Sequence, residues 1–144
     1  MKKETYTYPA IFKYSDDNIY ISFPDLEGCN TFAESEEDAI EFAKQILSLY
    51  IDGVEESDLP KPSSIKDIKT KKNEVIVLIE VWMPYYRASI KEYSVKKTLT
   101  IPGWLNVIAE QNKINFSKLL QESLKETLCV EEPKARYIVK RDEE

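Results

Sequence analysis

The chain has 144 residues, of which 42% are hydrophobic and 32% are charged, and its formal net charge is −6. This length fits one domain, or a small domain with an additional module, and the hydrophobic fraction is too high for a disordered chain. Histidine is absent, which excludes Ser-His-Asp and Cys-His catalysis, histidine-ligated zinc and a histidine pH switch within this polypeptide.

Targeting signals and cysteine usage indicate the cellular compartment. Residues 1–10 contain two lysines but lack the apolar run of a signal peptide. The longest uninterrupted apolar run, Val75–Ile79, is far shorter than the roughly 20 residues of a membrane-spanning helix. Cys29 and Cys129 are isolated, which favours reduced thiols over a disulfide framework or a metal site. We therefore expect a soluble, cytoplasmic protein without membrane association, metal or cofactor.

The negative charge is distributed unevenly along the chain. Residues 1–60 contain 14 acids and 4 bases, whereas residues 61–129 contain 7 acids and 12 bases. An acidic region attracts basic partners, and a basic region favours nucleic acid. The asymmetry indicates two modules with two kinds of partner; chance variation among solvated surfaces is the alternative for counts this small.

The first half of the chain has the pattern of a small α+β domain. Residues Thr5–Phe12 and Ile19–Phe23 have the alternation of strands, and the turn-forming residues 15–18 between them predict a hairpin. A third short strand is expected over Asn30–Ala33. After the polar, proline-containing connection 55–73, the nearly continuous apolar run 75–83 predicts a strand buried inside a sheet.

A helix is predicted between the third and fourth strands. Ser35 has the properties of an N-cap and precedes three acids in the first turn, where the helix dipole favours negative charge. Gly53 is expected to end the helix in the left-handed conformation. The apolar stripe consists of Ala39, Ala43, Ile46, Leu47, Tyr50 and Val54. Residues 1–84 therefore read as a β-β-β-α-β domain.

Residues 94–129 predict a strand followed by two helices. Pro102 opens the first helix, and Asn115 is the expected N-cap of the second, whose leucines recur at helical spacing. The unit has fewer than 40 residues, and its strand has no neighbour in sequence with which to pair. We expect the same strand of a second copy to complete a two-stranded ribbon, so that the protein forms a homodimer through this unit, with a tetramer as the alternative assembly.

The outward face of such a ribbon would carry Lys96, Thr98 and Thr100 of both copies. A two-stranded ribbon fits the major groove of DNA, where lysine reaches guanine acceptors and threonine contacts base edges. Backbone amides at the start of the second helix, around Phe116 and Ser117, are suited to hold a phosphate. The alternative is an ordinary exposed edge strand, which would also display lysine and threonine.

Two parts of the chain resemble known families. The segment Val95–Leu105, followed by Asn115–Leu120, is similar to a ribbon-helix-helix repressor domain. The upstream half resembles the HicB antitoxin family, and the two matches occur in the order that this family has when it carries that C-terminal domain. The upstream stretches that carry the resemblance are Tyr8–Phe12, Ile21–Cys29 and the helix 39–54.

The resemblance implies a type II toxin-antitoxin system. Its N-terminal domain, expected as a partial ribonuclease H-like fold over residues 1–84, would bind and block a HicA-type toxin, a small basic RNA-cleaving protein. After a connection over 85–93, a dimeric ribbon-helix-helix domain over 94–129 would bind operator DNA and repress the protein's own operon; the charged tail 130–144 has no assigned counterpart. By position, the base-reading residues would be Lys96, Thr98 and Thr100, and the phosphate contacts would come from the backbone near Asn115, Phe116 and Ser117.

Several side chains have more than one interpretation. Asp16, Asp25 and Glu27 lie in turn-rich sequence, which favours local hydrogen bonding; a share in toxin binding and a magnesium-dependent nuclease site are the alternatives. Tyr85, Tyr86 and Arg87 are interpreted as packing at a domain junction rather than as a nucleic-acid patch. We predict no catalytic residues. A stand-alone ribbon-helix-helix regulator with a sensory N-terminal domain is the second hypothesis for the whole chain.

Overall fold

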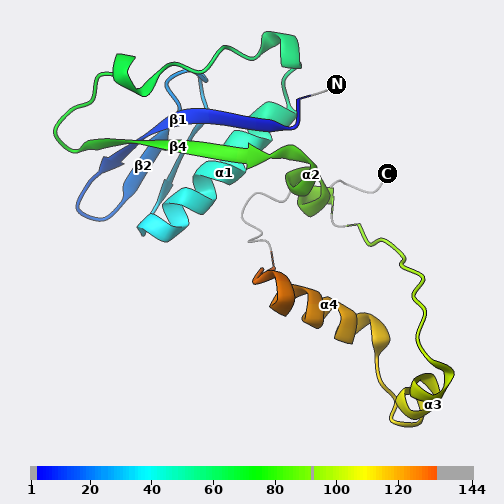
Figure 1. The fold of residues 1–144 in the computed structure, drawn as a ribbon. Coiled ribbons are helices and arrows are strands. Elements are labelled where there is room, and N and C mark those ends of the chain that lie inside the picture. Colours follow the sequence, from blue (N-terminus) through cyan, green and yellow to red (C-terminus); the bar gives the residue numbers. More distant parts are fainter. Residues whose placement is uncertain (1–2, 92, 133–144) are drawn as a thin grey trace, which may run out of the picture. The chain divides into compact units, whose positions relative to one another are not determined.

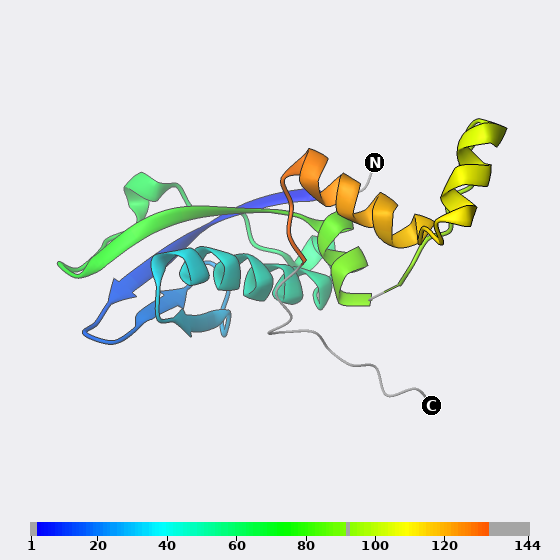
Figure 2. The same ribbon diagram turned by 90° about the horizontal axis from the view of Figure 1, so that it is seen from below.

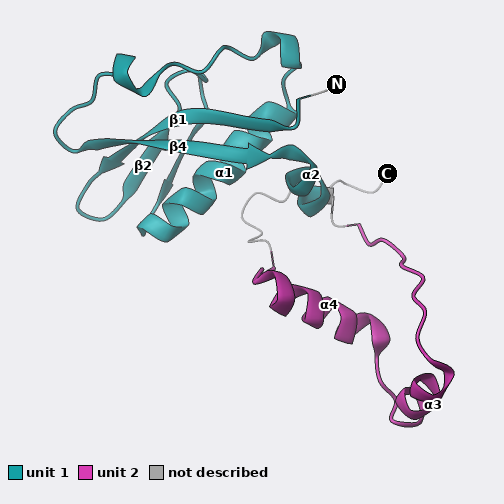
Figure 3. Cartoon of the chain, viewed as in Figure 1, with its two compact units in different colours: residues 1–92, 137–144 teal, residues 93–136 magenta. Residues whose placement is uncertain are grey.

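The computed structural model describes residues 3–91 and 93–132. The chain divides into two compact units, whose described parts are residues 3–91 and residues 93–132 (Figures 1 and 3). We call them the N-terminal unit and the C-terminal unit. Most of the predicted charged tail, residues 133–144, lies outside the described residues.

The N-terminal unit is built on a four-stranded antiparallel sheet in the order β3-β2-β1-β4. Its strands are β1 (Thr5–Tyr14), β2 (Ile19–Ser22), β3 (Asn30–Ala33) and β4 (Glu74–Trp82). The predicted hairpin is present, and the backbone N–H of Ser15 donates to the carbonyl of Asn18 across its turn at 2.9 Å. The α+β class predicted for this half of the chain is confirmed.

Strand β4 differs from the expectation of a strand buried inside the sheet. Among the described residues it pairs with β1 alone, with Ile79 opposite Tyr8, and so forms an edge of the sheet. Ile79 and Val81 point into the core, whereas 53% of Leu78 and 57% of Trp82 are exposed. A continuous apolar run is typical of strands that have helices on both faces. Here the described residues place a helix of the unit on one face, and the outward half of the run remains accessible.

Helix α1 (Glu36–Asp52) covers one face of the sheet (Figure 2). The hydroxyl oxygen of Ser35 accepts a hydrogen bond from the backbone N–H of Asp38 at 3.2 Å, as predicted for an N-cap. The prediction of a left-handed Gly53 is wrong, because its φ is −89°. The last turn closes with a hydrogen bond from the Gly53 N–H to the Tyr50 carbonyl, so no left-handed residue is required. Val54 lies beyond the helix.

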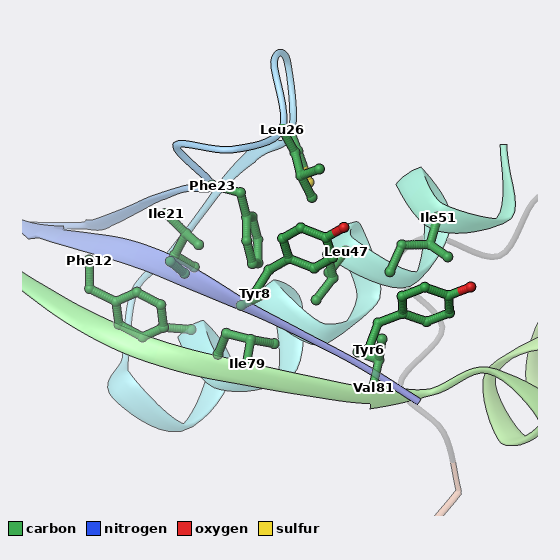
Figure 4. Packing of buried hydrophobic residues seen from close by; sticks show 14 of the residues in the cluster. Tyr6, Tyr8, Phe12, Ile21, Phe23, Leu26, Leu47, Ile51, Ile79 and Val81 are labelled. Atoms are coloured by element: carbon green, nitrogen blue, oxygen red, sulfur yellow. The ribbon is translucent and has the colours of Figure 1, made fainter. Parts of the chain in front are cut away.

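The core of the N-terminal unit lies between α1 and the inner face of the sheet (Figure 4). Alternate residues of β1 contribute aromatic rings, because successive side chains of a strand point to opposite faces. The labelled core residues are Tyr6, Tyr8, Phe12, Ile21, Phe23, Leu26, Leu47, Ile51, Ile79 and Val81. The connection 55–73 contains two short 3-10 helices, η1 (Glu56–Asp58) and η2 (Ile65–Asp67), and is anchored where the Tyr8 hydroxyl donates to the Pro60 carbonyl at 2.6 Å.

Helix α2 (Met83–Lys91) follows β4 directly and occupies most of the range expected as a connection over 85–93. Met83 is fully buried, and the Tyr86 hydroxyl donates to the backbone carbonyl of Gln45 in α1 at 2.9 Å. Tyr86 therefore packs inside the N-terminal unit rather than at a junction between domains. The apolar contacts of these two residues explain why the chain stays helical here instead of forming a loose linker.

The C-terminal unit contains the two predicted helices, α3 (Gly103–Gln111) and α4 (Phe116–Leu128). Asn115 caps α4, since its side-chain oxygen accepts from the Lys118 N–H at 3.1 Å. Residues 94–101 have no assigned secondary structure in the single chain, so the predicted ribbon, which requires a second copy, remains a prediction. None of the helices in the described ranges is long and apolar enough to cross a membrane.

Candidate functional site

The C-terminal unit exposes most of its apolar side chains. No residue of α3 or α4 is buried in the single chain, although α4 has leucines at three- and four-residue spacing. Large apolar areas on a protein surface often mark interaction sites. We call the following residues the C-terminal apolar surface: Val95, Leu99, Ile101, Trp104, Leu105, Ile108, Phe116, Leu119, Leu124 and Leu128. Exposed apolar residues in this number are typical of an interaction surface.

The three candidate base-reading residues lie on the extended segment before α3. Lys96, Thr98 and Thr100 are exposed, and they alternate with the apolar Val95, Leu99 and Ile101, which are exposed as well. In a paired strand these two sets would lie on opposite faces. The single chain brings the three polar residues to the surface without ordering them on a sheet.

The candidate phosphate contacts lie at the first turn of α4. The Asn115 side chain is engaged in capping the helix. Phe116 and Ser117 are the first two helical residues, and N–H groups at these positions have no partner within their own helix and lie at its positive end. An anion at this turn would therefore be held by backbone N–H groups, while the Asn115 side chain caps the helix.

The basic residues of 61–129 are divided between the two units. The described part of the C-terminal unit contains five lysines and five glutamates. The lysine-rich stretch 61–72, which supplied much of the basic excess of residues 61–129, belongs to the N-terminal unit. Positive charge for a nucleic acid would therefore come locally from Lys96 and Lys97, and a two-fold ribbon would bring both copies of each together.

The N-terminal unit is acidic overall, but its three candidate acids do not form one cluster. Its described part contains 17 acids and 10 bases. The Asp25 carboxylate accepts hydrogen bonds from Ser63, one from the backbone N–H at 2.9 Å and one from the hydroxyl, and so holds the connection 55–73. Asp16 lies in the β1–β2 turn, and Glu27 lies beyond the other end of β2. Both are exposed and available to a partner.

Sequence reasoning missed the outer face of the sheet. The outward residues Tyr20, Phe32, Leu78 and Trp82 are each between 44% and 57% exposed, and the rings of Tyr20 and Phe32 lie 6.3 Å apart between centroids. The sequence indicates this face in two ways: apolar residues occupy both the odd and the even positions of β4, and aromatic residues occupy the outward positions of β2 and β3. Exposed aromatic side chains of this kind are frequent in protein interfaces.

The two cysteines differ in accessibility. Cys29 is buried, its thiol donates to the Ile46 carbonyl at 3.7 Å, and burial raises its pKa to about 12. Cys129 is exposed at the end of α4. Within the described ranges, no three His, Cys, Asp or Glu side chains are arranged to hold a metal ion.

Comparison with known proteins identifies the family. A family model described as a HicB-like antitoxin of bacterial toxin-antitoxin systems matches residues 8–124, from β1 into α4. The chain is also similar to a solved structure described as a toxin-antitoxin complex from Streptococcus pneumoniae, with a TM-score of 0.51 and 27% sequence identity over 85% of this chain and 99% of that chain. A search of curated proteins found no match. Because the family model covers most of the sequence, the chain belongs to the HicB-like antitoxins of bacterial toxin-antitoxin systems.

Proposed function

We propose that this antitoxin neutralises a HicA-type toxin by direct binding through its N-terminal unit, and that it represses its own operon through its C-terminal unit. The observation that carries the proposal is the family match over residues 8–124, which spans parts of both units. The similarity to a chain of a toxin-antitoxin complex supports a toxin as one partner. In this proposal the protein acts by binding and catalyses no reaction.

The N-terminal unit has the properties expected of a surface for a basic protein. Its excess of acids over bases would steer a cationic toxin toward it and raise the association rate. Asp16 and Glu27 are exposed and lie beyond opposite ends of β2, so a toxin that contacts both would extend along the length of this strand. The exposed aromatic residues of the outer sheet face would supply apolar contacts beside these charges.

The C-terminal unit has the properties expected of a dimeric DNA-binding domain. Two copies of residues 94–101 would pair as an antiparallel ribbon, and the C-terminal apolar surfaces of both copies would pack together. Pairing would place Lys96, Thr98 and Thr100 on the outward face, where a ribbon reads the major groove. The first turn of α4 would then bind a DNA phosphate through the amides of Phe116 and Ser117.

Toxin binding is tested by co-expressing the full-length chain with the product of the adjacent reading frame. We expect the two proteins to co-purify and the antitoxin to restore growth. If the adjacent product is toxic and neither co-purification nor growth protection is observed, the antitoxin mechanism proposed here is refuted. Operator binding that survives such a failure would favour the stand-alone regulator.

Operator binding is tested with the triple variant Lys96→Ala, Thr98→Ala and Thr100→Ala at a fixed salt concentration. We expect a loss of operator affinity of about 100-fold or more, since each base contact contributes about 1–3 kcal/mol. The matched control is the double variant Lys69→Ala and Thr70→Ala in the connection of the N-terminal unit, which should bind normally. An unchanged affinity of the triple variant, with the dimer intact, would show that this face does not read DNA.

A further inference from the structure

The N-terminal unit contains a pocket at the end of α1 that no sequence pattern predicted. It has a volume of about 660 Å³ and lies among the last turn of α1, the start of β1, the segment 53–59 that includes η1, and α2. Its polar lining includes Tyr6, Asp52, Glu55, Glu56 and Arg87. The volume falls within the range of about 300–1,000 Å³ that is typical of ligand pockets.

The charges around this pocket favour a cation. Three carboxylates line it against one guanidinium, and that guanidinium is already paired, with Arg87 Nε 3.1 Å from Asp52 Oδ1. The carboxylates of Glu55 and Glu56 are exposed and have no hydrogen bond or ion pair with any described residue. The carbonyl end of α1, which carries the negative end of the helix dipole, adds to their field.

Tyr6 adds an accessible hydroxyl to the wall of the pocket. The residue is only 6% exposed, yet its hydroxyl forms no hydrogen bond with the described residues. Figure 4 shows the hydroxyl at the far end of the ring beside Ile51, which also lines the pocket. Burial, followed by the charge of Glu56, raises the Tyr6 pKa, whereas Arg87 lowers it. The hydroxyl thus stays protonated at neutral pH, and its oxygen is free to accept a hydrogen bond.

The ring of Tyr6 is buried in the core, but its hydroxyl oxygen is not among the fully buried polar atoms and is reached from the pocket. A hydroxyl oxygen at the wall of an acidic pocket can accept a hydrogen bond from a donor that enters the pocket. A lysine ammonium or an arginine guanidinium has several N–H donors and a long aliphatic stem. The aliphatic part would pack against Ile51 and Leu59, which line the same pocket.

We propose that this pocket receives a lysine or arginine side chain of the toxin. The proposal rests on the proposed function, because the N-terminal unit is there the toxin-binding unit. The cation donates to the carboxylates of Glu55 and Glu56 and to the hydroxyl oxygen of Tyr6. The net negative charge of the unit and the basic character expected of the toxin favour this occupant over an acidic or neutral one.

The carboxylates are tested with the full-length double variant Glu55→Gln and Glu56→Gln, titrated with the purified product of the adjacent reading frame by calorimetry at low and high salt. We expect the affinity to fall about tenfold or more and to become less sensitive to salt. The control is Glu34→Gln and Glu37→Gln, two exposed acids near the other end of α1, which removes the same formal charge and should change the affinity much less.

Two outcomes separate this inference from the proposed function. If the wild-type chain does not bind the toxin, the proposed function fails. If the wild-type chain binds, but the pocket variant binds equally well or loses no more than the control, the toxin contact lies elsewhere and the pocket inference alone is overturned.

Tyr6→Phe tests the hydroxyl without removing the ring from the core. We expect toxin affinity to fall several-fold, while the thermal midpoint of the free protein does not fall, because the hydroxyl has no partner to lose. A variant that binds toxin as tightly as the wild type would refute the role of Tyr6. A variant that loses stability instead would show that the hydroxyl serves the fold and not a ligand.

Discussion

The C-terminal apolar surface makes dimer stability a sensitive measure of the proposed assembly. Leu119 in α4 is 53% exposed in the single chain. Full burial of a leucine side chain contributes about 1.5–3 kcal/mol, so burial of the exposed half contributes about 0.75–1.5 kcal/mol per copy. Both copies lose this contribution in a two-fold dimer. Leu119→Ala should therefore weaken the dimer by about 1.5–3 kcal/mol, or about 10- to 150-fold in dissociation constant.

Sedimentation equilibrium of the full-length chain measures this change directly. Gln121→Ala is the matched control, because Gln121 is exposed on the opposite side of α4 and alanine preserves helix propensity at both positions. The control should dimerise like the wild type, and circular dichroism should show equal helix content in all three proteins. An unchanged dissociation constant for Leu119→Ala would place the dimer contact elsewhere, and the ribbon-helix-helix arrangement would lose its main physical argument.

Two further predictions concern the N-terminal unit. Leu47→Ala, at a fully buried position of α1, should lower the free energy of unfolding by about 2–5 kcal/mol in urea denaturation. The control Lys44→Ala, on the exposed side of α1, should change this free energy by less than about 0.5 kcal/mol. Equal effects of the two variants would contradict the observed packing of α1. Cys29 should resist alkylation at pH 8 in the native protein while Cys129 reacts, because burial raises the Cys29 pKa from 9.0 to about 12. Mass spectrometry after alkylation would contradict the protection of Cys29 if both thiols reacted equally fast. The same pKa shift should make the free energy of unfolding fall as pH rises from 9.0 toward 12, since only the unfolded state releases the proton there.

Local features of the fold could be predicted because their causes lie within a few residues. The side chains of Ser35 and Asn115 each bond to an N–H three positions along, so the sequence is sufficient to recognise both caps. The alternation of Ile19, Ile21 and Phe23 likewise predicted the buried face of β2 and the residue after it. The two helices of the C-terminal unit follow from the same short-range rules.

Other features depended on which elements become neighbours. The apolar run of β4 is compatible with a central or an edge strand, and only the pairing of β4 with β1 alone decides between them. The sequence favoured local turn hydrogen bonds for Asp25, but its hydrogen-bond partner Ser63 is 38 positions away. Helix α2 was missed because its stability comes from the contacts of Met83 and Tyr86 with the rest of the unit rather than from helix propensity.

The candidate sites likewise include features that contiguous residues predict and features that depend on tertiary packing. The sequence by itself determined the family resemblance, the caps and the alternation of Lys96, Thr98 and Thr100 with apolar residues, because these are properties of contiguous residues. Only the tertiary structure assigned the lysine-rich stretch 61–72 to the N-terminal unit and brought Tyr6, Glu55, Glu56 and Arg87 around one pocket. Those residues come from segments up to about 80 positions apart, and the approach of such segments depends on packing that no local pattern encodes.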